Sequence, residues 1–189
     1  MGNSEPVAPL GRTGAGGTNV SDALITKPLD GTSVIEVLAL YRVTARGRSG
    51  LARSPEEIDE SYVRQFLDRA SADGSAFGVI CPDGLLCGEI HAFRMGPLQF
   101  RHVLTDLTIA VHPGWQGKGV GTRLFNAMIE RARSLAPPIA RIELVAREGN
   151  ADAIRLYERL GFVREGRFTK RVRLPNGELE DDIPIALLL

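Results

Sequence analysis

The chain has 189 residues, of which 43% are hydrophobic and 24% are charged, and its 23 Lys and Arg residues balance its 23 Asp and Glu residues. This composition is typical of one globular domain and excludes a collagen-like or wholly disordered chain. The zero net charge argues against nucleic acid as the main partner, because such proteins usually carry a basic excess.

The N-terminal segment carries no targeting pattern. Residues 1–21 are rich in glycine and proline, which predicts a flexible leader before a single domain at residues 22–189. The segment lacks the basic and apolar regions of a secretory signal, and no stretch approaches the ~18 apolar residues of a membrane helix. We therefore expect a cytoplasmic protein without membrane contact.

The first predicted elements are a strand and a helix. Residues 23–28 fit a short strand, and Thr32 or Ser33 precedes a run with apolar residues at helical spacing up to Tyr41. Residues 42–53 are basic and contain glycine, which predicts a loop.

A second helix and three strands are predicted next. Ser54, followed by proline and two acidic residues, is a typical helix start. Residues 76–81 and 85–94 fit two strands around a Pro-Asp-Gly turn, and residues 102–112 fit a third. Cys81 and Cys87 flank that turn, where a disulfide is conceivable, but two reduced, buried thiols are favoured.

The second half predicts a helix at residues 120–135, a strand at 139–146 and a helix at 151–160 that ends at Gly161. A final hairpin with strands at 162–174 and 179–188 follows. Helices and strands thus alternate along the chain without internal repeats. This order predicts an α/β (α+β) fold with a mixed, mostly antiparallel sheet of about seven strands flanked by helices.

A glycine-rich loop lies between the strand at 102–112 and the helix at 120–135. Gly117, Gly119 and Gly121 alternate there, so backbone N–H groups stay uncovered at the start of a helix, which favours an anion such as a pyrophosphate. The spacing fits neither a P-loop nor a dinucleotide fingerprint, which disfavours a nucleotide-binding module. A glycine-rich turn without a ligand is the alternative.

Two motifs around this loop resemble one family. Gln116, Gly119 and Gly121 match the Gln/Arg-x-x-Gly-x-Gly/Ala motif of the Gcn5-related N-acetyltransferase (GNAT) family. About thirty residues later, Asn150 opens a helix, Tyr157 lies near its end and Gly-Phe follows, as in the second motif of that family. Two matches in the right order are more specific than either one alone.

The resemblance implies an acetyl-CoA-dependent N-acetyltransferase that uses acetyl-CoA as co-substrate and needs no metal. In the family, the strand before the loop splays from its neighbour and exposes backbone groups to the pantetheine arm and the thioester carbonyl. The residues that the resemblance assigns to coenzyme binding are Ile109, Ala110, Val111, Gln116, Gly117, Lys118, Gly119, Val120, Gly121, Thr122, Asn150 and Tyr157.

The resemblance also suggests Tyr157 as the general acid for the departing thiolate, because a phenol with pKa ~10 can protonate a thiolate with pKa ~8.5. An interior packing role is the alternative. Asn150 is either a coenzyme contact or only a helix cap.

The sequence leaves the identity of the general base undecided. The family often carries Glu at the place of Thr105, which cannot serve as a base. Asp106 is adjacent but would face the other side of the strand unless a bulge intervenes. Glu89 and His91 share a face of the preceding strand. We keep Asp106 and Glu89 as candidates beside a water chain.

The acceptor is predicted to be a primary amine of a small molecule, an amino acid or a protein N-terminus. Glu180, Asp181 and Asp182 can attract a cationic amine, although a solvated strand start is the favoured interpretation. Pairing of exposed sheet edges allows a homodimer. A non-catalytic acyl-CoA sensor with the same fold is the alternative function.

Overall fold

The computed structural model describes residues 23–47 and 51–189, so the predicted leader at residues 1–21 lies outside the described residues. An eight-stranded sheet in the order β1-β2-β3-β4-β5-β8-β6 forms the centre, with β7 also paired to β8. Among the strands of the described residues, only β4 and β5 pair in parallel. The predicted mixed, mostly antiparallel sheet is therefore confirmed, with eight strands in place of about seven.

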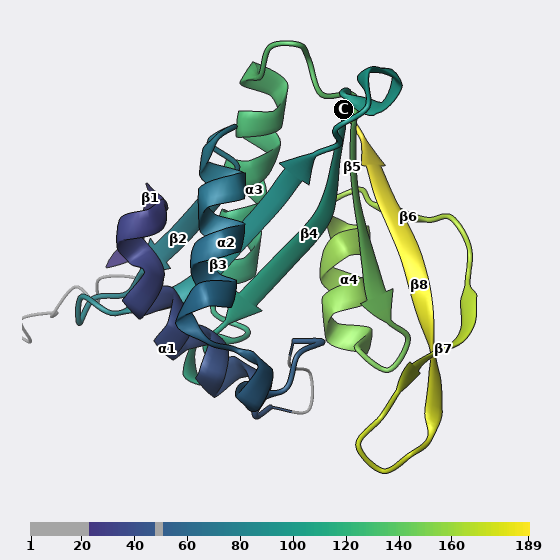
Figure 1. Ribbon diagram of the computed structural model, residues 1–189, viewed down its shortest axis with the longest axis horizontal. Helices are drawn as coiled ribbons and strands as arrows, with labels where there is room; N and C mark the ends of the chain where they lie inside the picture. The colour runs from purple at the N-terminus through teal and green to yellow at the C-terminus, as the bar shows by residue number, and fades with distance from the viewer. Residues whose placement is uncertain (1–22, 48–50) are drawn as a thin grey trace, which may run out of the picture.

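Helices cover both faces of this sheet (Figure 1). The strands are β1 (Ile25–Pro28), β2 (Ala76–Ile80), β3 (Leu86–Arg94), β4 (Val103–Val111), β5 (Arg141–Arg147), β6 (Val163–Arg164), β7 (Phe168–Arg173) and β8 (Leu179–Leu188). The helices are α1 (Val34–Ala45), α2 (Glu60–Ser71), α3 (Val120–Ser134) and α4 (Ala151–Arg159).

Two hydrophobic cores hold these layers together. One joins the sheet to α3 and α4, with Leu124, Met128 and Ile142 fully buried. The other lies beneath α1 and α2, around Val37 and Leu67. Each such side chain contributes ~1.5–3 kcal/mol through its removal from water, so both helical layers are fixed to the sheet that carries the candidate site.

The start of α1 differs from the prediction. The side chain of Asp30 accepts a hydrogen bond from the backbone N–H of Thr32 at 2.8 Å and caps a short 3-10 turn over Gly31–Ser33. Ser33 precedes α1 but makes no capping hydrogen bond. The helix also runs to Ala45, so the predicted loop begins later than residue 42, and its residues 48–50 lie outside the described residues.

The start of α2 also differs. Ser54 begins only a 3-10 turn at Pro55–Glu57, where its backbone N–H donates to Glu57 at 2.9 Å. The helix itself starts at Glu60, because Asp59 accepts a hydrogen bond from the backbone N–H of Tyr62 at 2.7 Å. Asp59 therefore has the capping role that the sequence interpretation gave to Ser54.

The C-terminal hairpin is interrupted on one side. The predicted strand at residues 162–174 is divided into β6 and β7, and the register of β7 against β8 shifts between Phe168 and Val172. Lys170 adopts a positive φ of 54° within this irregularity, and its backbone N–H donates to Asp181 at 2.7 Å. The break between β6 and β7 falls at residues 165–167, whereas Lys170 makes a bulge within β7.

Cys81 and Cys87 are free and buried, as the sequence interpretation favoured. Within residues 23–47 and 51–189, no helix has the length and the apolar character needed to cross a membrane.

Candidate active site

The candidate site is an opening between β4 and β5. The two strands pair only at Val103 with Arg141 and at Leu104 with Ile142, whereas β5 continues to Arg147 and stays paired with β8. In Figure 1 the two strands diverge toward the end of β4, and α4 lies behind the opening. The splay that the resemblance implied is thus present.

The main chain of β4 turns alternate polar groups into this opening. The backbone N–H of His112 donates to the carbonyl oxygen of Cys87 at 2.9 Å, and Ala110 is registered with Glu89. The main-chain polar groups of His112 and Ala110 therefore face β3. By alternation, the N–H and C=O groups of Ile109 and Val111 face the opposite side. The Nε2 of Gln116 donates to Val111 O at 3.2 Å, in agreement with this direction. The opening therefore presents main-chain donors and acceptors to an extended amide-containing ligand.

A β-bulge at Asp106 marks the start of the opening. The register between β3 and β4 shifts between His91 and Phe93, and Asp106 has a positive φ of 53°. The sequence interpretation required such a bulge for Asp106 to change its facing, and the bulge is present. Asp106 is exposed, and such backbone strain often occurs at functional sites.

The glycine loop lies at the wide end of the opening. Gly117 and Gly119 have φ values of 72° and 83°, and a Cβ added at either would meet nothing within 4 Å. Gly119 is the N-cap of α3 and has no side chain to cover the first amides of that helix. These N–H groups lack intrahelical partners and carry the positive end of the helix dipole, which suits a phosphate.

The other residues of the loop have additional structural roles. A Cβ on Gly121 would approach Leu156 of α4 to 2.9 Å, so this glycine lets the two helices pack closely. The Nζ of Lys118 lies 4.9 Å from the ring centroid of Trp115, which holds a cation beside the loop. The sequence interpretation assigned Gly121 to the coenzyme alone and missed this packing contact.

Tyr157 lies on α4, behind the opening. Its ring is buried and lies 5.3 Å from the Phe125 centroid and 6.1 Å from that of Phe162. Burial raises the pKa of the phenol to about 12, so it keeps its proton at any physiological pH. The packing contact is observed, and it does not exclude a role as an acid.

Asn150 caps α4. Its side-chain oxygen accepts a hydrogen bond from the backbone N–H of Ala153 at 3.4 Å. The helix-cap role is therefore present, and the coenzyme contact remains a prediction.

Glu89 belongs to a buried polar cluster beneath α1 and α2. Tyr41 donates its hydroxyl to Oε2 of Glu89 at 2.5 Å, and Nδ1 of His91 lies 3.0 Å from the other oxygen. The ring of Phe66 stacks on His91 at 4.1 Å. Burial and the neighbouring carboxylate raise the pKa of Tyr41 well above its ordinary value. Glu89 is 0% exposed, so an acceptor cannot reach it directly.

A carboxylate that sequence reasoning missed lies at the narrow end of the opening. Glu143 of β5 accepts a hydrogen bond from Thr105 Oγ1 at 2.9 Å and another from Nε of Arg141 at 2.8 Å. Its position in an alternating strand gave no reason to select it. The signal available was the missing carboxylate at Thr105, which the neighbouring strand supplies.

The acidic run in β8 is largely paired within the chain. Arg167 donates to Asp181 at 2.8 Å and also to Glu148, which ties the hairpin to the loop before α4. The backbone N–H of Gly149 donates to Glu180. These pairs favour the structural interpretation of the run over an amine-attracting surface.

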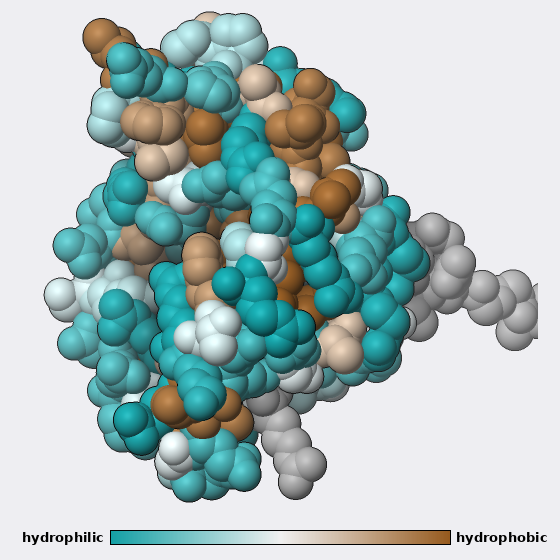
Figure 2. All heavy atoms as spheres, turned by 90° about the vertical axis from the view of Figure 1, so that its right-hand side faces the viewer, coloured by the Kyte–Doolittle hydropathy of each residue, from teal (hydrophilic) through white to brown (hydrophobic). Residues whose placement is uncertain are grey.

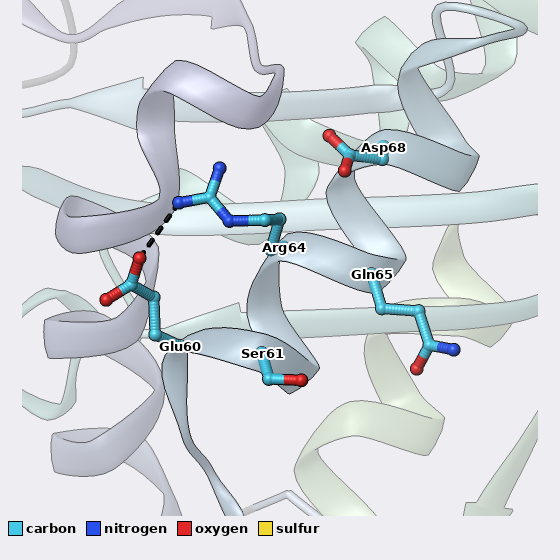
Figure 3. A pocket seen from close by; sticks show the side chains of 5 residues that line it. All are labelled: Glu60, Ser61, Arg64, Gln65 and Asp68. Atoms are coloured by element: carbon cyan, nitrogen blue, oxygen red, sulfur yellow. Dashed lines mark hydrogen bonds and ion pairs between the residues drawn. The ribbon is translucent and has the colours of Figure 1, made fainter.

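Two surface depressions lie outside the opening. One is lined by five residues on the outer side of α2, with Arg64 and Glu60 paired at 2.8 Å (Figure 3). The other lies at the C-terminal hairpin, around Lys170 and Leu179. Neither depression includes a residue of the opening. The candidate site is therefore defined by the separation of β4 from β5 and by the glycine loop.

Exposed apolar side chains occur at the edge of the sheet formed by β6, β7 and β8. Figure 2 faces this edge and shows hydrophobic atoms in several separate places among hydrophilic ones. Val163, Phe168 and Leu188 are among the exposed residues. The predicted homodimer remains a prediction.

Comparisons with known proteins agree with this geometry. Residues 38–162 match the model of the acetyltransferase (GNAT) family. The L-amino acid N-acetyltransferase AaaT of Escherichia coli K12 is 32% identical over 127 residues, which cover 67% of this chain and 75% of that protein.

Solved structures that are similar in fold include two that hold acetyl-CoA. YncA, a putative acetyltransferase of Salmonella typhimurium with its cofactor acetyl-CoA, has a TM-score of 0.75 at 20% identity and covers 88% of this chain and 94% of its own. The phosphinothricin acetyltransferase of Sinorhizobium meliloti, in complex with acetyl-CoA, has a TM-score of 0.77 at 16% identity, over 88% of this chain and 89% of its own.

The buried cluster makes a prediction about stability. Replacement Glu89→Ala leaves Tyr41 and His91 without their shared acceptor, so we expect the free energy of unfolding to fall by ~3 kcal/mol in a urea titration followed by circular dichroism. As a control, Glu36→Ala removes an exposed ion pair with Lys27 and should cost less than ~1 kcal/mol. Equal small losses in both variants would contradict a structural role for Glu89.

Proposed function

The chain belongs to the acetyltransferase (GNAT) family, and as an acetyl-CoA-dependent N-acetyltransferase of that family we propose that it acetylates the primary amine of a small molecule, with free L-amino acids as the first candidates. The opening between β4 and β5, with Gly117 and Gly119 at its wide end, supports the coenzyme part of this proposal. The similarity to the L-amino acid N-acetyltransferase AaaT supports the acceptor. The two free, buried cysteines are consistent with a cytoplasmic location.

The residues fit acetyl-CoA on two counts. The uncovered amides at the start of α3 suit the diphosphate, since neither Gly117 nor Gly119 has a side chain in the way. The polar main-chain groups of Ile109 and Val111 suit the amide-containing pantetheine arm. When bound, the coenzyme supplies an activated acetyl thioester whose carbonyl carbon is attacked by the acceptor nitrogen.

The protein groups then have separate roles. A main-chain N–H near Val111 stabilises the carbonyl oxygen as it gains negative charge. With acetyl-CoA bound, formation of the N–C bond would place the negative charge on that oxygen. Its return to the carbonyl would break the C–S bond, whose electron pair would leave with the sulfur. Tyr157 donates its proton to that sulfur, and the proton released by the amine passes to water or to a carboxylate at the site. Asp106 is exposed at the bulge and is the more accessible of the two carboxylates predicted from the sequence, because Glu89 is buried.

A turnover assay tests the proposed function. The chain is incubated with acetyl-CoA and one amine at a time: the twenty L-amino acids, spermidine and a peptide with a free N-terminus. Release of the free thiol with at least one L-amino acid, at a rate above the hydrolysis of acetyl-CoA alone, is the expected result. Binding of acetyl-CoA without turnover of any amine would favour the non-catalytic sensor.

The glycine loop predicts an electrostatic effect on coenzyme binding. Acetyl-CoA at ~100 times its dissociation constant should stabilise the wild type by ~2.7 kcal/mol in a thermal or chemical unfolding experiment. Gly119→Asp should abolish this stabilisation, because it places a carboxylate beside the diphosphate. Gly119→Asn is the matched control, since asparagine has the same size, tolerates positive φ and carries no charge. Equal coenzyme affinity in the two variants would argue against a phosphate at this loop.

The role of Tyr157 predicts both a rate and a pH dependence. Tyr157→Phe should lower kcat by ~10- to 1000-fold and leave the dissociation constant of acetyl-CoA unchanged, because the ring still packs on Phe125 and Phe162. Since the pKa of Tyr157 is about 12, the acid stays protonated as the pH rises. Tyr157 should therefore add no descending limb of its own to the pH profile of kcat/KM below pH ~11. An unchanged kcat in the variant would leave Tyr157 only its packing role.

A further inference from the structure

Glu143 continues the contact between β4 and β5 beyond the point where their backbones separate. Leu104 and Ile142 are the last registered pair of the parallel ladder. The next residue is Thr105 on β4 and Glu143 on β5. Their side chains are joined at 2.9 Å. Glu143 therefore lies beside Thr105 at the narrow end of the opening. The Asp106 bulge is the next residue of β4.

The carboxylate of Glu143 retains capacity to bind a ligand. Thr105 donates to Oε1, and Nε of Arg141 donates to Oε2 at 2.8 Å. An ionised carboxylate has about four acceptor sites on its two oxygens, so each oxygen can accept another hydrogen bond. The Glu143 side chain is 31% exposed, in contrast to the fully buried Glu89.

Glu143, Glu165 and Arg141 together carry a net negative charge. Arg141 is shared, because it also pairs with Glu165 through its Nη atoms. Two carboxylates thus face one guanidinium, and a cation that binds beside Glu143 would neutralise the remaining charge. Arg141 also holds Glu143 in one orientation, which preorganises it for a ligand.

The direction of the opening brings the reactive end of the coenzyme toward this carboxylate. The glycine loop, proposed as the seat of the diphosphate, lies at the wide end. The pantetheine arm along β4 then points from the loop toward the narrow end. An acceptor amine that reacts with the thioester must enter on this side, and most primary amines are cations at neutral pH.

We propose that Glu143 is an acceptor-binding residue, which attracts and holds the cationic amine of the acceptor at the narrow end of the opening, and that Thr105 is the residue that positions it. This inference rests on the proposed function and identifies part of its acceptor site. It also accounts for Thr105 at a place where the family often has Glu, because the carboxylate stands on the adjacent strand and the threonine hydroxyl orients it.

The test uses Glu143→Gln, which keeps the size of the side chain and an oxygen for Thr105 but removes the charge. With the best L-amino acid of the turnover panel, we expect the acceptor KM to rise by ~10- to 100-fold, the range of a hydrogen bond to a charged group. The KM of the wild type should rise with ionic strength, and this salt dependence should shrink in the variant. The dissociation constant of acetyl-CoA and the melting temperature should stay unchanged.

Two further variants separate binding from structure. Glu60→Gln removes a carboxylate that pairs with Arg64 on the outer side of α2, outside the opening, and should change the acceptor KM by less than ~2-fold. Thr105→Glu in the Glu143→Gln background returns a carboxylate to the same end of the opening and should recover part of the lost affinity.

An acceptor KM within ~2-fold of the wild type in Glu143→Gln, or a fall in kcat alone, would overturn the inference while the proposed function stands. Absence of turnover in the wild type would overturn the proposed function and this inference with it.

Discussion

A strand that loses its neighbour exposes main-chain N–H and C=O groups, which need a partner from water, from a side chain or from a ligand. In this chain β4 loses β5 after Leu104, although β5 keeps its full pairing with β8 on the other side. The sheet therefore does not fray at an edge but opens in its interior. The helices behind it, α3 and α4, stay packed and close the back of the opening. This rigid frame lets the exposed groups stay fixed in position without a ligand, which lowers the entropic cost of binding one.

Several local features depend on that opening. The Asp106 bulge changes the facing of β4 where the pairing ends, and the strain of its positive φ is tolerated because β3 holds the rest of the strand. The strand then leads directly into the glycine loop and the start of α3. A ligand that follows β4 thus meets neutral main-chain groups first and a concentrated positive field last. That order suits a molecule with an extended polar arm and an anionic end.

Local sequence signals predicted most of this arrangement, and non-local contacts account for the rest. The loop glycines and the cap at Asn150 act through backbone conformation and hydrogen bonds within a few residues, so the sequence is sufficient to find them. Ser54 carried all the local marks of a helix start, yet Asp59 caps α2, because the burial of Ile58 and Val63 decides where the helix packs. Glu143 could not be selected from the sequence, since its importance comes from Thr105, 38 residues away.

The buried cluster of Tyr41, Glu89 and His91 is costly, because a polar cluster of this kind is often no more stabilising than apolar residues of the same volume. The cluster fixes the position of α1 on the sheet. Glu89 accepts a hydrogen bond from Tyr41 of α1 and contacts His91 on its own strand, so α1 can dock on β3 in one register only. Apolar side chains such as Val37 and Leu67 would tolerate a small slide of the helix. Since β3 is also the strand that holds β4 in place, the cluster fixes α1 and α2 relative to the opening. A wall of the acceptor site built on these helices would then keep its distance from the coenzyme, which is the geometry that transfer between two bound molecules requires.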